Sequence, residues 1–202
     1  MQPRIIIADD HSMIRKGLKL ILQTNLGFKN VTEVSTCSAL MNELKKGACT
    51  HLILDVILTD CTALEIVPNI ISLYPKMEIM IFSMQISEVY GDVFKQYGIK
   101  FYLNKTLNED DTLTYMRRFL HNLEPIEGEK RNPTKNPFAL LSPRELEILH
   151  YLLNGHKTKD IAITLNLTMS TVSTIKKRIF DKIETDNMTQ VLELATLYNI
   201  NY

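Results

Sequence analysis

Polar residues close the apolar runs in the first half of the chain: Asp9, Asp10, Asp55, Ser83 and Lys105. Three carboxylates brought together would raise one another's pKa values unless a cation neutralised them. Oxygen ligands favour a hard ion such as Mg²⁺, which typically binds one or two carboxylates together with water and phosphate oxygens. A lysine supplies charge to a phosphate, and a serine donates a hydrogen bond to it. These residue types therefore predict a Mg²⁺ site that handles a phosphoryl group.

Asp55 raises a further question, because it ends the apolar run at residues 51–56. An ionised carboxylate is costly to bury unless a partner compensates it, so Asp55 lies either near solvent or beside a cation. Its position at the end of a strand places it at the exposed mouth of the site. The sequence contains no glycine-rich nucleotide loop. The phosphoryl group is therefore small, or is carried by Asp55 itself.

Each of these residues also has an ordinary structural explanation. Asp10 can cap a helix that starts near Ser12, since aspartate favours that position. Lys105 can be a solvated charge at a strand end, and Ser83 can be a turn residue. Their joint occurrence at the ends of alternating strands is what favours a site.

Short β-branched runs alternate with amphipathic segments of helix length from Arg4 to His121, which is typical of βαβ units. The expected strands are residues 4–9, 30–35, 51–56, 78–83 and 100–105, and the expected helices lie near 13–25, 39–46, 63–73, 87–97 and 108–120. Most of these strands are continuously apolar, as in a parallel sheet covered on both faces, whereas 30–35 alternates like an edge strand. The pattern predicts a doubly wound α/β sheet, which binds ligands outside the carboxyl ends of its strands.

The composition fits a globular protein of one or two domains. Of the 202 residues 45% are hydrophobic, and 23 basic residues balance 23 acidic ones. No apolar stretch approaches the roughly 18 residues of a membrane helix, and the N-terminus lacks a secretory signal, so we expect a cytoplasmic protein without a membrane partner. Cys37, Cys49 and Cys61 are odd in number and lack metal-site spacing, which favours reduced, structural thiols.

The character of the sequence changes after His121. The next 16 residues are rich in proline and charge, which indicates a linker, and the remainder has helical periodicity without a strand signal. The expected order is a domain over residues 1–121, a linker over 122–137 and a small all-α domain over 138–202. Ser142, Pro143 and Glu145 mark a capped helix start, and Gly155 marks its end. Further helices are expected over residues 158–165, 170–183 and 188–198.

The helix predicted over residues 170–183 has two distinct faces. Its inward stripe consists of Val172, Ile175, Ile179 and Ile183. The opposite face carries Ser170, Ser173, Thr174, Lys177 and Asp181, flanked by Arg178. Four basic residues against one acidic residue give this segment a net charge of +3 (4 − 1). A basic helix after a short helix and a turn suits a helix-turn-helix in the major groove, although a solvated charged face is equally consistent with composition alone.

Residues 1–121 resemble the receiver domain of two-component response regulators. The matching motifs are the acidic pair in ADDHSMIRKGL, the aspartate in LILDVILTD, the serine in IFSMQ and the lysine in FYLNK. The resemblance implies a flavodoxin-like fold in which Asp55 accepts a phosphoryl group from a sensor histidine kinase. It implies that Mg²⁺ is held by Asp9, Asp10, Asp55 and the backbone carbonyl of Ile57. Ser83 and Lys105 would contact the phosphoryl group, and Tyr102 would be an aromatic switch.

The C-terminal segment resembles the LuxR-type helix-turn-helix through LSPRELEIL, the glycine in LLNGHKTKDIA, and STVSTIKKRIFDKI. A receiver followed by this domain defines the NarL/FixJ subfamily. The resemblance implies that double-stranded DNA is read by Ser173, Thr174 and Lys177, with phosphate contacts from Lys159, Lys176 and Arg178. It also implies that the last helix forms a homodimer in the active protein.

These features together predict a phosphorylation-dependent DNA-binding transcription regulator and not an enzyme. A phosphatase would need a second carboxylate two residues after Asp55, where Ile57 stands. A phosphorylation-independent regulator stays open as an alternative, because Thr59, Ala63 and Met84 depart from the family pattern.

Overall fold

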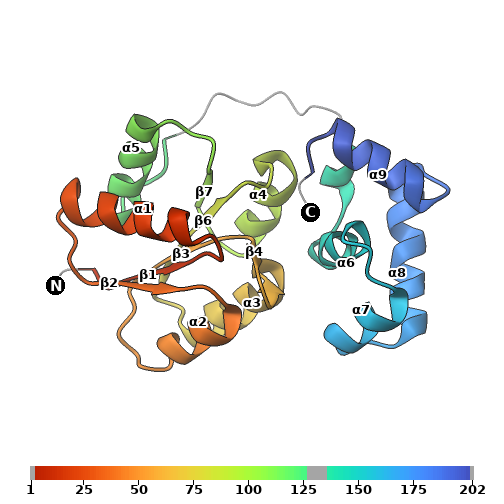
Figure 1. Cartoon of the computed structure of the whole chain (residues 1–202), viewed down its shortest axis with the longest axis horizontal. Helices are drawn as coiled ribbons and strands as arrows, with labels where there is room; N and C mark the ends of the chain where they lie inside the picture. The colour runs from red at the N-terminus through yellow and green to blue at the C-terminus, as the bar shows by residue number, and fades with distance from the viewer. Residues whose placement is uncertain (1–2, 127–135, 201–202) are drawn as a thin grey trace. The chain divides into compact units, whose positions relative to one another are not determined.

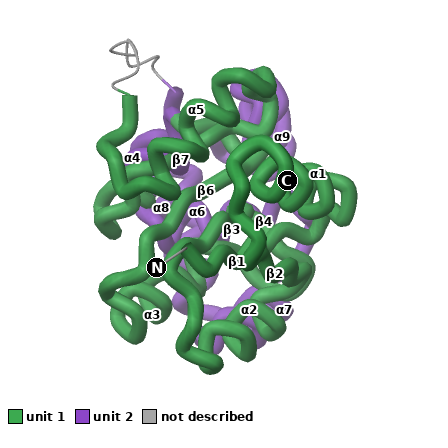
Figure 2. Tube along the Cα trace, turned by 90° about the vertical axis from the view of Figure 1, so that its left-hand side faces the viewer, with its two compact units in different colours: residues 1–87, 94–130 green, residues 88–93, 131–202 purple. Residues whose placement is uncertain are grey.

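The computed structural model describes residues 3–126 and 136–200. The chain divides into two compact units, one of residues 1–87 and 94–130 and the other of residues 88–93 and 131–202, coloured green and purple in Figure 2. None of the helices in the described part of the chain has the length and apolar content needed to span a membrane.

The first unit is built on a five-stranded parallel sheet with the order β2-β1-β3-β6-β7. Its strands are β1 (Ile5–Ala8), β2 (Val31–Val34), β3 (His51–Leu54), β6 (Glu78–Ser83) and β7 (Phe101–Asn104). The helices that alternate with them along the chain are α1 (Ser12–Thr24), α2 (Cys37–Leu44), α3 (Ala63–Leu73), α4 (Ser87–Gln96), whose residues 88–93 are grouped with the second unit, and α5 (Glu109–Leu120). The predicted doubly wound sheet is confirmed.

Burial explains why the apolar runs form these strands. Every residue of β1 and β3 is buried, whereas β2 has only Val34 buried and lies at the edge of the sheet, which is the position predicted for it. One core cluster joins Ile5, Ile7 and Ile53 of the sheet to Leu22 of α1 and Phe119 of α5. Figure 1 accordingly shows α1 and α5 on one side of the sheet and α2 and α3 on the other.

The starts of α1 and α3 bear on Asp10 and Ala63, and the expected capping role of Asp10 needs correction. Helix α1 begins at Ser12 with His11 as its N-cap residue, so Asp10 lies one position too early to cap it and its carboxylate stays available to the site. Ala63 is the buried first residue of α3, where Thr62 and Glu65 form a capping box. The non-glycine residues with positive φ in the described part of the chain are Asn122, Asn166, Glu184 and Asn199, so Ala63 has an ordinary backbone conformation.

Asp55 is followed by a short antiparallel ribbon, which the sequence did not predict. It consists of β4 (Ile57–Leu58) and β5 (Cys61–Thr62), in which Ile57 pairs with Thr62 and Leu58 with Cys61. The ribbon brings Cys61 to Cys37 at the start of α2, and the two are joined by a disulfide with Cα atoms 6.0 Å apart. The expectation of three reduced thiols is therefore wrong in this structure, because pairing depends on distance in space and not on CxxC spacing.

The second unit is helical, as predicted. Its elements are the 3₁₀ turn η1 (Pro137–Leu140) and the helices α6 (Pro143–Leu153), α7 (Thr158–Thr164), α8 (Met169–Lys182) and α9 (Met188–Leu197). Ser142 and Glu145 form the expected capping box of α6, and Gly155 has the positive φ that ends this helix. Leu146, Val172, Ile179, Val191 and Ala195 are all fully buried and bring α6, α8 and α9 into one core.

Part of the predicted linker, residues 127–135, lies outside the described residues. The segment before it is attached to the first unit, since Leu123 N donates to Arg118 O at 2.9 Å and Lys100 Nζ lies 2.6 Å from Glu124 Oε1. Pro137 belongs to η1, and Asn136 caps that turn. The domain limits at 121 and 138 stay predictions.

Candidate functional sites

The parallel strands bring four of the predicted site residues to one edge of the sheet. Asp9 follows β1, Asp55 follows β3, Ser83 ends β6 and Lys105 follows β7. Lys105 Nζ lies 2.5 Å from Asp55 Oδ2 and 2.7 Å from Asp9 Oδ2. Ser83 Oγ donates a hydrogen bond to Asp55 Oδ1 at 2.5 Å. Each carboxylate oxygen of Asp55 therefore faces a donor, and either donor could instead bind an oxygen atom of a group attached to Asp55.

Asp55 is buried, with 5% of its surface exposed, so the expected position at an exposed mouth is wrong. Of the two alternatives, a position near solvent or a position beside a cation, the structure has the second, because the Asp55 carboxylate is paired with Lys105. Burial raises the pKa of Asp55 above its usual value, while Lys105 and Ser83 act to lower it. Asp9 also raises the pKa of Asp55, as expected for neighbouring carboxylates, but its effect is smaller than that of burial.

Asp10 and His11 complete the acidic side of this edge. One ligand atom from each of Asp9, Asp10, His11 and Asp55 lies within 4.8 Å of the others. His11 Nδ1 is 2.6 Å from Asp10 Oδ1, and the His11 amide donates to Asp9 Oδ1 at 2.8 Å. Sequence reasoning did not select His11, although its position beside the acidic pair was the available signal.

Ile57 lies two residues after Asp55, in β4, and is held there by its pairing with Thr62. Its backbone is thus part of the ribbon beside the acidic residues. Thr59 is exposed in the turn of this ribbon, and the Met84 side chain after Ser83 is 47% exposed.

Tyr102 is half-buried on β7. Its hydroxyl donates to the carbonyl oxygen of Gln85 at 2.9 Å, and the Gln85 amide donates to Ser83 Oγ at 3.4 Å. A hydrogen-bonded path therefore leads from Asp55 through Ser83 and Gln85 to Tyr102. Gln85 was missed by sequence reasoning, because its part in this path is played by backbone atoms that any residue type offers.

The second unit presents the predicted polar face of α8. Ser173, Thr174, Lys177 and Arg178 are exposed on it, and Lys159 is exposed on α7. Lys176 is half-buried, with Nζ 5.4 Å from the centre of the Phe180 ring. The Thr174 hydroxyl donates to Ser170 O at 2.9 Å, so it is engaged with its own helix. Of the predicted inward stripe, Val172, Ile179 and Ile183 are buried and Ile175 is half-buried.

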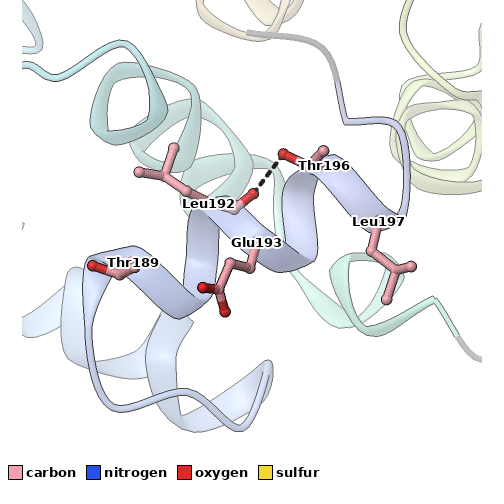
Figure 3. A pocket seen from close by; sticks show the side chains of 5 residues that line it. All are labelled: Thr189, Leu192, Glu193, Thr196 and Leu197. Atoms are coloured by element: carbon pink, nitrogen blue, oxygen red, sulfur yellow. Dashed lines mark hydrogen bonds between the residues drawn. The ribbon is translucent and has the colours of Figure 1, made fainter.

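Helix α9 carries a shallow hollow of about 480 Å³ on its outer face (Figure 3). The hollow is lined by Thr189, Leu192, Glu193, Thr196 and Leu197. Val191 and Ala195 face the core of the unit, whereas Leu197 is 71% exposed. The apolar residues of α9 therefore serve two surfaces, one inside the unit and one outside.

Comparison with known families gives a match for each part of the chain. Residues 5–117 match the family described as "Response regulator receiver domain", and residues 139–195 match "Bacterial regulatory proteins, luxR family". A five-stranded receiver fold with an acidic edge, followed by a helix-turn-helix, defines a DNA-binding response regulator. The chain belongs to the response regulators, and its domain order places it in their NarL/FixJ subfamily.

Relatives match over nearly the whole chain. The response regulator UvrY of Escherichia coli (strain K12) is 25% identical over 209 residues, covering 97% of this chain and 94% of UvrY. The oxygen regulatory protein NreC of Staphylococcus carnosus is 27% identical over 213 residues, covering 95% of this chain and 96% of NreC. The fold matches RcsB of Salmonella enterica serovar Typhimurium, solved on promoter rprA with the phosphomimetic BeF₃⁻, with a TM-score of 0.78, 22% identity and coverage of 97% and 99%.

Proposed function

We propose that this response regulator is switched by phosphorylation of Asp55 by a sensor histidine kinase. The observation that carries the proposal is the pairing of the buried Asp55 carboxylate with Ser83 and Lys105. In the transfer, a carboxylate oxygen forms a bond to phosphorus while the phosphorus–nitrogen bond of the donor histidine breaks. The product is an acylphosphate whose new oxygens take over the donors that Asp55 now occupies.

A divalent cation fits the same edge of the sheet. Carboxylate oxygens of Asp9, Asp10 and Asp55 within 4.8 Å of one another are the donor set that a hard ion such as Mg²⁺ prefers. These three residues, with the carbonyl oxygen of Ile57, would hold it. When bound, the ion neutralises negative charge on the phosphoryl oxygens. After the transfer, the positive charge of Lys105 would remain beside the acylphosphate.

The switch would reach the rest of the unit through Ser83. A phosphoryl group draws the Ser83 hydroxyl away from Asp55, and the Gln85 backbone and Tyr102 hydroxyl follow along the hydrogen-bonded path. A rearrangement at Asp55 would thus move the partly exposed Tyr102 side chain and so alter the surface of this unit.

The output is binding to double-stranded DNA by a homodimer in the cytoplasm. Ser173, Thr174 and Lys177 would meet base edges, while Lys159, Lys176 and Arg178 would contact phosphates. Support comes from the exposure of these residues, apart from the half-buried Lys176, and from RcsB, which has been solved bound to promoter rprA and as two dimers bound to two parallel DNAs. The outer face of α9 would supply the dimer contact.

The test is intact mass after incubation of the full chain with Mg²⁺ and acetyl phosphate. We expect a gain of about 80 Da that hydroxylamine removes, as for an acylphosphate. The control variant Asp55→Asn should show no gain. If no donor or candidate kinase yields the product, phosphorylation dependence is refuted and a phosphorylation-independent DNA-binding regulator replaces it.

A further inference from the structure

The Cys37–Cys61 pair lies immediately beside the segment that follows the acceptor aspartate. Cys37 is the first residue of α2, and Cys61 begins β5. Their Cα atoms are 6.0 Å apart, within the range of about 4.4–6.8 Å seen for disulfides. The residues are 24 positions apart in the chain, so the bond closes a loop that contains Asp55.

Asp60 holds the two cysteines together without using their sulfur atoms. Its Oδ1 accepts the Cys37 amide at 2.6 Å, and its Oδ2 accepts the Ser38 amide at 3.0 Å and the Ser38 hydroxyl at 2.8 Å. Since Asp60 directly precedes Cys61, these bonds keep the two cysteines near each other before the sulfurs are joined, and the covalent bond adds the restriction that hydrogen bonds alone do not give. The pair is preorganised, which favours bond formation within the chain over bonds to other thiols.

The third cysteine, Cys49, is held in its protonated form, whereas one member of the pair lies at a helix start. Cys61 is partly exposed, and Cys37 stands at a helix start, a position that stabilises thiolates. Cys49 is different, because burial raises the pKa of its thiol to about 11. It therefore stays protonated at neutral pH and reacts slowly.

We propose that Cys37 and Cys61 form a reversible redox site that clamps the β4–β5 ribbon beside Asp55 under oxidising conditions. The Cys61 thiolate attacks a small-molecule disulfide and forms a mixed disulfide, releasing one thiol. The Cys37 thiolate then attacks the Cys61 sulfur and releases the second thiol. The protein gives up two electrons and two protons, and the oxidant becomes two thiols.

The bond restricts a ribbon on which the acidic site depends. Cys61 pairs with Leu58, Thr62 pairs with Ile57, and the Ala63 amide donates to Val56 O at 2.8 Å. The clamp thus ties the backbone after Asp55 to the start of α2. Because the ribbon begins two residues after Asp55, we expect its restriction to slow phosphoryl uptake several-fold; this consequence rests on the proposed function. A DNA-binding regulator works where thiols are usually kept reduced, so the bond is transient and regulatory.

The experiment compares the full chain reduced by a phosphine with the full chain treated with glutathione disulfide. Maleimide labelling in denaturant, read by intact mass, should count three thiols before oxidation and one after it. Cys49→Ser is the matched control and should keep the loss of two thiols. Cys61→Ser should retain two thiols or carry a glutathione adduct. Oxidation should slow the hydrogen exchange of residues 56–63 in the unmodified protein, and it should leave this exchange unchanged in Cys61→Ser.

Several results would overturn the inference. One is three reactive thiols after oxidation, and another is tight Zn²⁺ binding by the reduced chain that blocks oxidation, which would make Cys37, Asp60 and Cys61 a metal site. A disulfide that leaves hydrogen exchange and phosphoryl uptake unchanged would refute the clamp. If neither redox form takes up a phosphoryl group, the proposed function fails, while the thiol count and exchange still decide the redox site.

Discussion

At Asp55 the cost of burial and the benefit of two donors oppose each other. Lys105 and Ser83 both bind the ionised carboxylate, yet burial has the larger effect and the pKa of Asp55 is raised. The folded protein thus stabilises the charged form less than water does. A phosphoryl group moves the negative charge outward onto new oxygens, toward Lys105 and a bound cation.

We predict that Asp55→Asn raises the free energy of unfolding at pH 7 by an amount on the order of 1 kcal/mol. The neutral amide removes the buried charge, and Lys105 keeps Asp9 as its partner. Because the folded pKa of Asp55 is raised, the native aspartate is fully stabilising only below its unfolded pKa, and that stability is lost as pH rises through the folded pKa. The difference between the two chains should therefore shrink as the solution is acidified.

Urea unfolding, with hydrogen exchange of β1 and β3 amides to report on the first unit, measures this effect. Asp110→Asn, at an exposed position, is the control and should change stability little. A large loss of stability in Asp55→Asn at pH 7 would mean that the pairing with Lys105 outweighs burial.

Among the elements, α6 and α8 are joined by one ion pair with a buried end. Glu145 is 6% exposed, and its Oε2 lies 2.7 Å from Lys182 Nζ. Burial acts to raise the pKa of Glu145, but hydrogen bonds from Lys182 and Ser142 outweigh it and hold the pKa below its usual value. The same carboxylate caps α6 by accepting the Ser142 amide at 2.7 Å.

Glu145→Gln should lower the stability of the second unit by about 1 kcal/mol at pH 7, a small figure because water screens the partly exposed Lys182. The glutamine keeps the capping geometry, so the loss reports the charge. Since the folded pKa is depressed, the contribution is present above the unfolded pKa and disappears as pH falls through the folded pKa. Thermal unfolding between pH 7 and pH 3 checks this, with Glu193→Gln as an exposed control.

Variants of α8 should separate base reading from phosphate contact. Arg178→Ala should weaken binding to all DNA sequences and reduce the slope of log affinity against log salt by about 1. Lys177→Ala should cost about 1–3 kcal/mol on a selected site and relax its sequence preference. Fluorescence anisotropy with selected and random duplexes at several salt concentrations measures both. Lys46→Ala, on an exposed lysine after α2, should change neither; equal losses for Lys177→Ala on both duplexes would contradict base reading.

The elements could be predicted where periodicity is long enough to read. The runs at 5–8 and 51–54 are continuously apolar, and the stripe on α8 repeats over three turns. The ribbon at 57–62 could not be predicted, because two-residue strands have no periodicity. The burial of Asp55 depends on Lys105, 50 residues later, and the Cys37–Cys61 contact depends on that unpredicted ribbon. The sequence thus predicted which residues meet at this edge of the sheet, but it did not predict that Asp55 is buried there.

For the whole molecule, the proposed signal is a coupling between Asp55 and DNA affinity through dimer formation. Couplings of this kind are typically about 1–3 kcal/mol, so phosphorylation should change DNA affinity by a factor of about 5–150. Such a graded response needs a dimer that is weak before activation. The single exposed leucine at the end of α9 suits a weak contact.

Leu197→Glu should abolish dimer formation on DNA while leaving thermal stability within about 0.5 kcal/mol, since the side chain is 71% exposed. Sedimentation on a two-half-site duplex should show one chain bound where the unmodified protein binds two. Leu73→Glu, at a 62% exposed position on α3, is the matched control. Retained dimers in Leu197→Glu would place the contact elsewhere.

The loop closed by Cys37 and Cys61 also affects how the modified aspartate can be found. Trypsin cleaves after lysine, so it releases residues 30–45, which contain Cys37, and residues 47–76, which contain both Asp55 and Cys61. While the disulfide is intact, these two peptides remain one branched species. A search for the phosphorylated fragment at its linear mass would then miss it, and the oxidised protein would look unmodified in a digest even when every molecule carried the group.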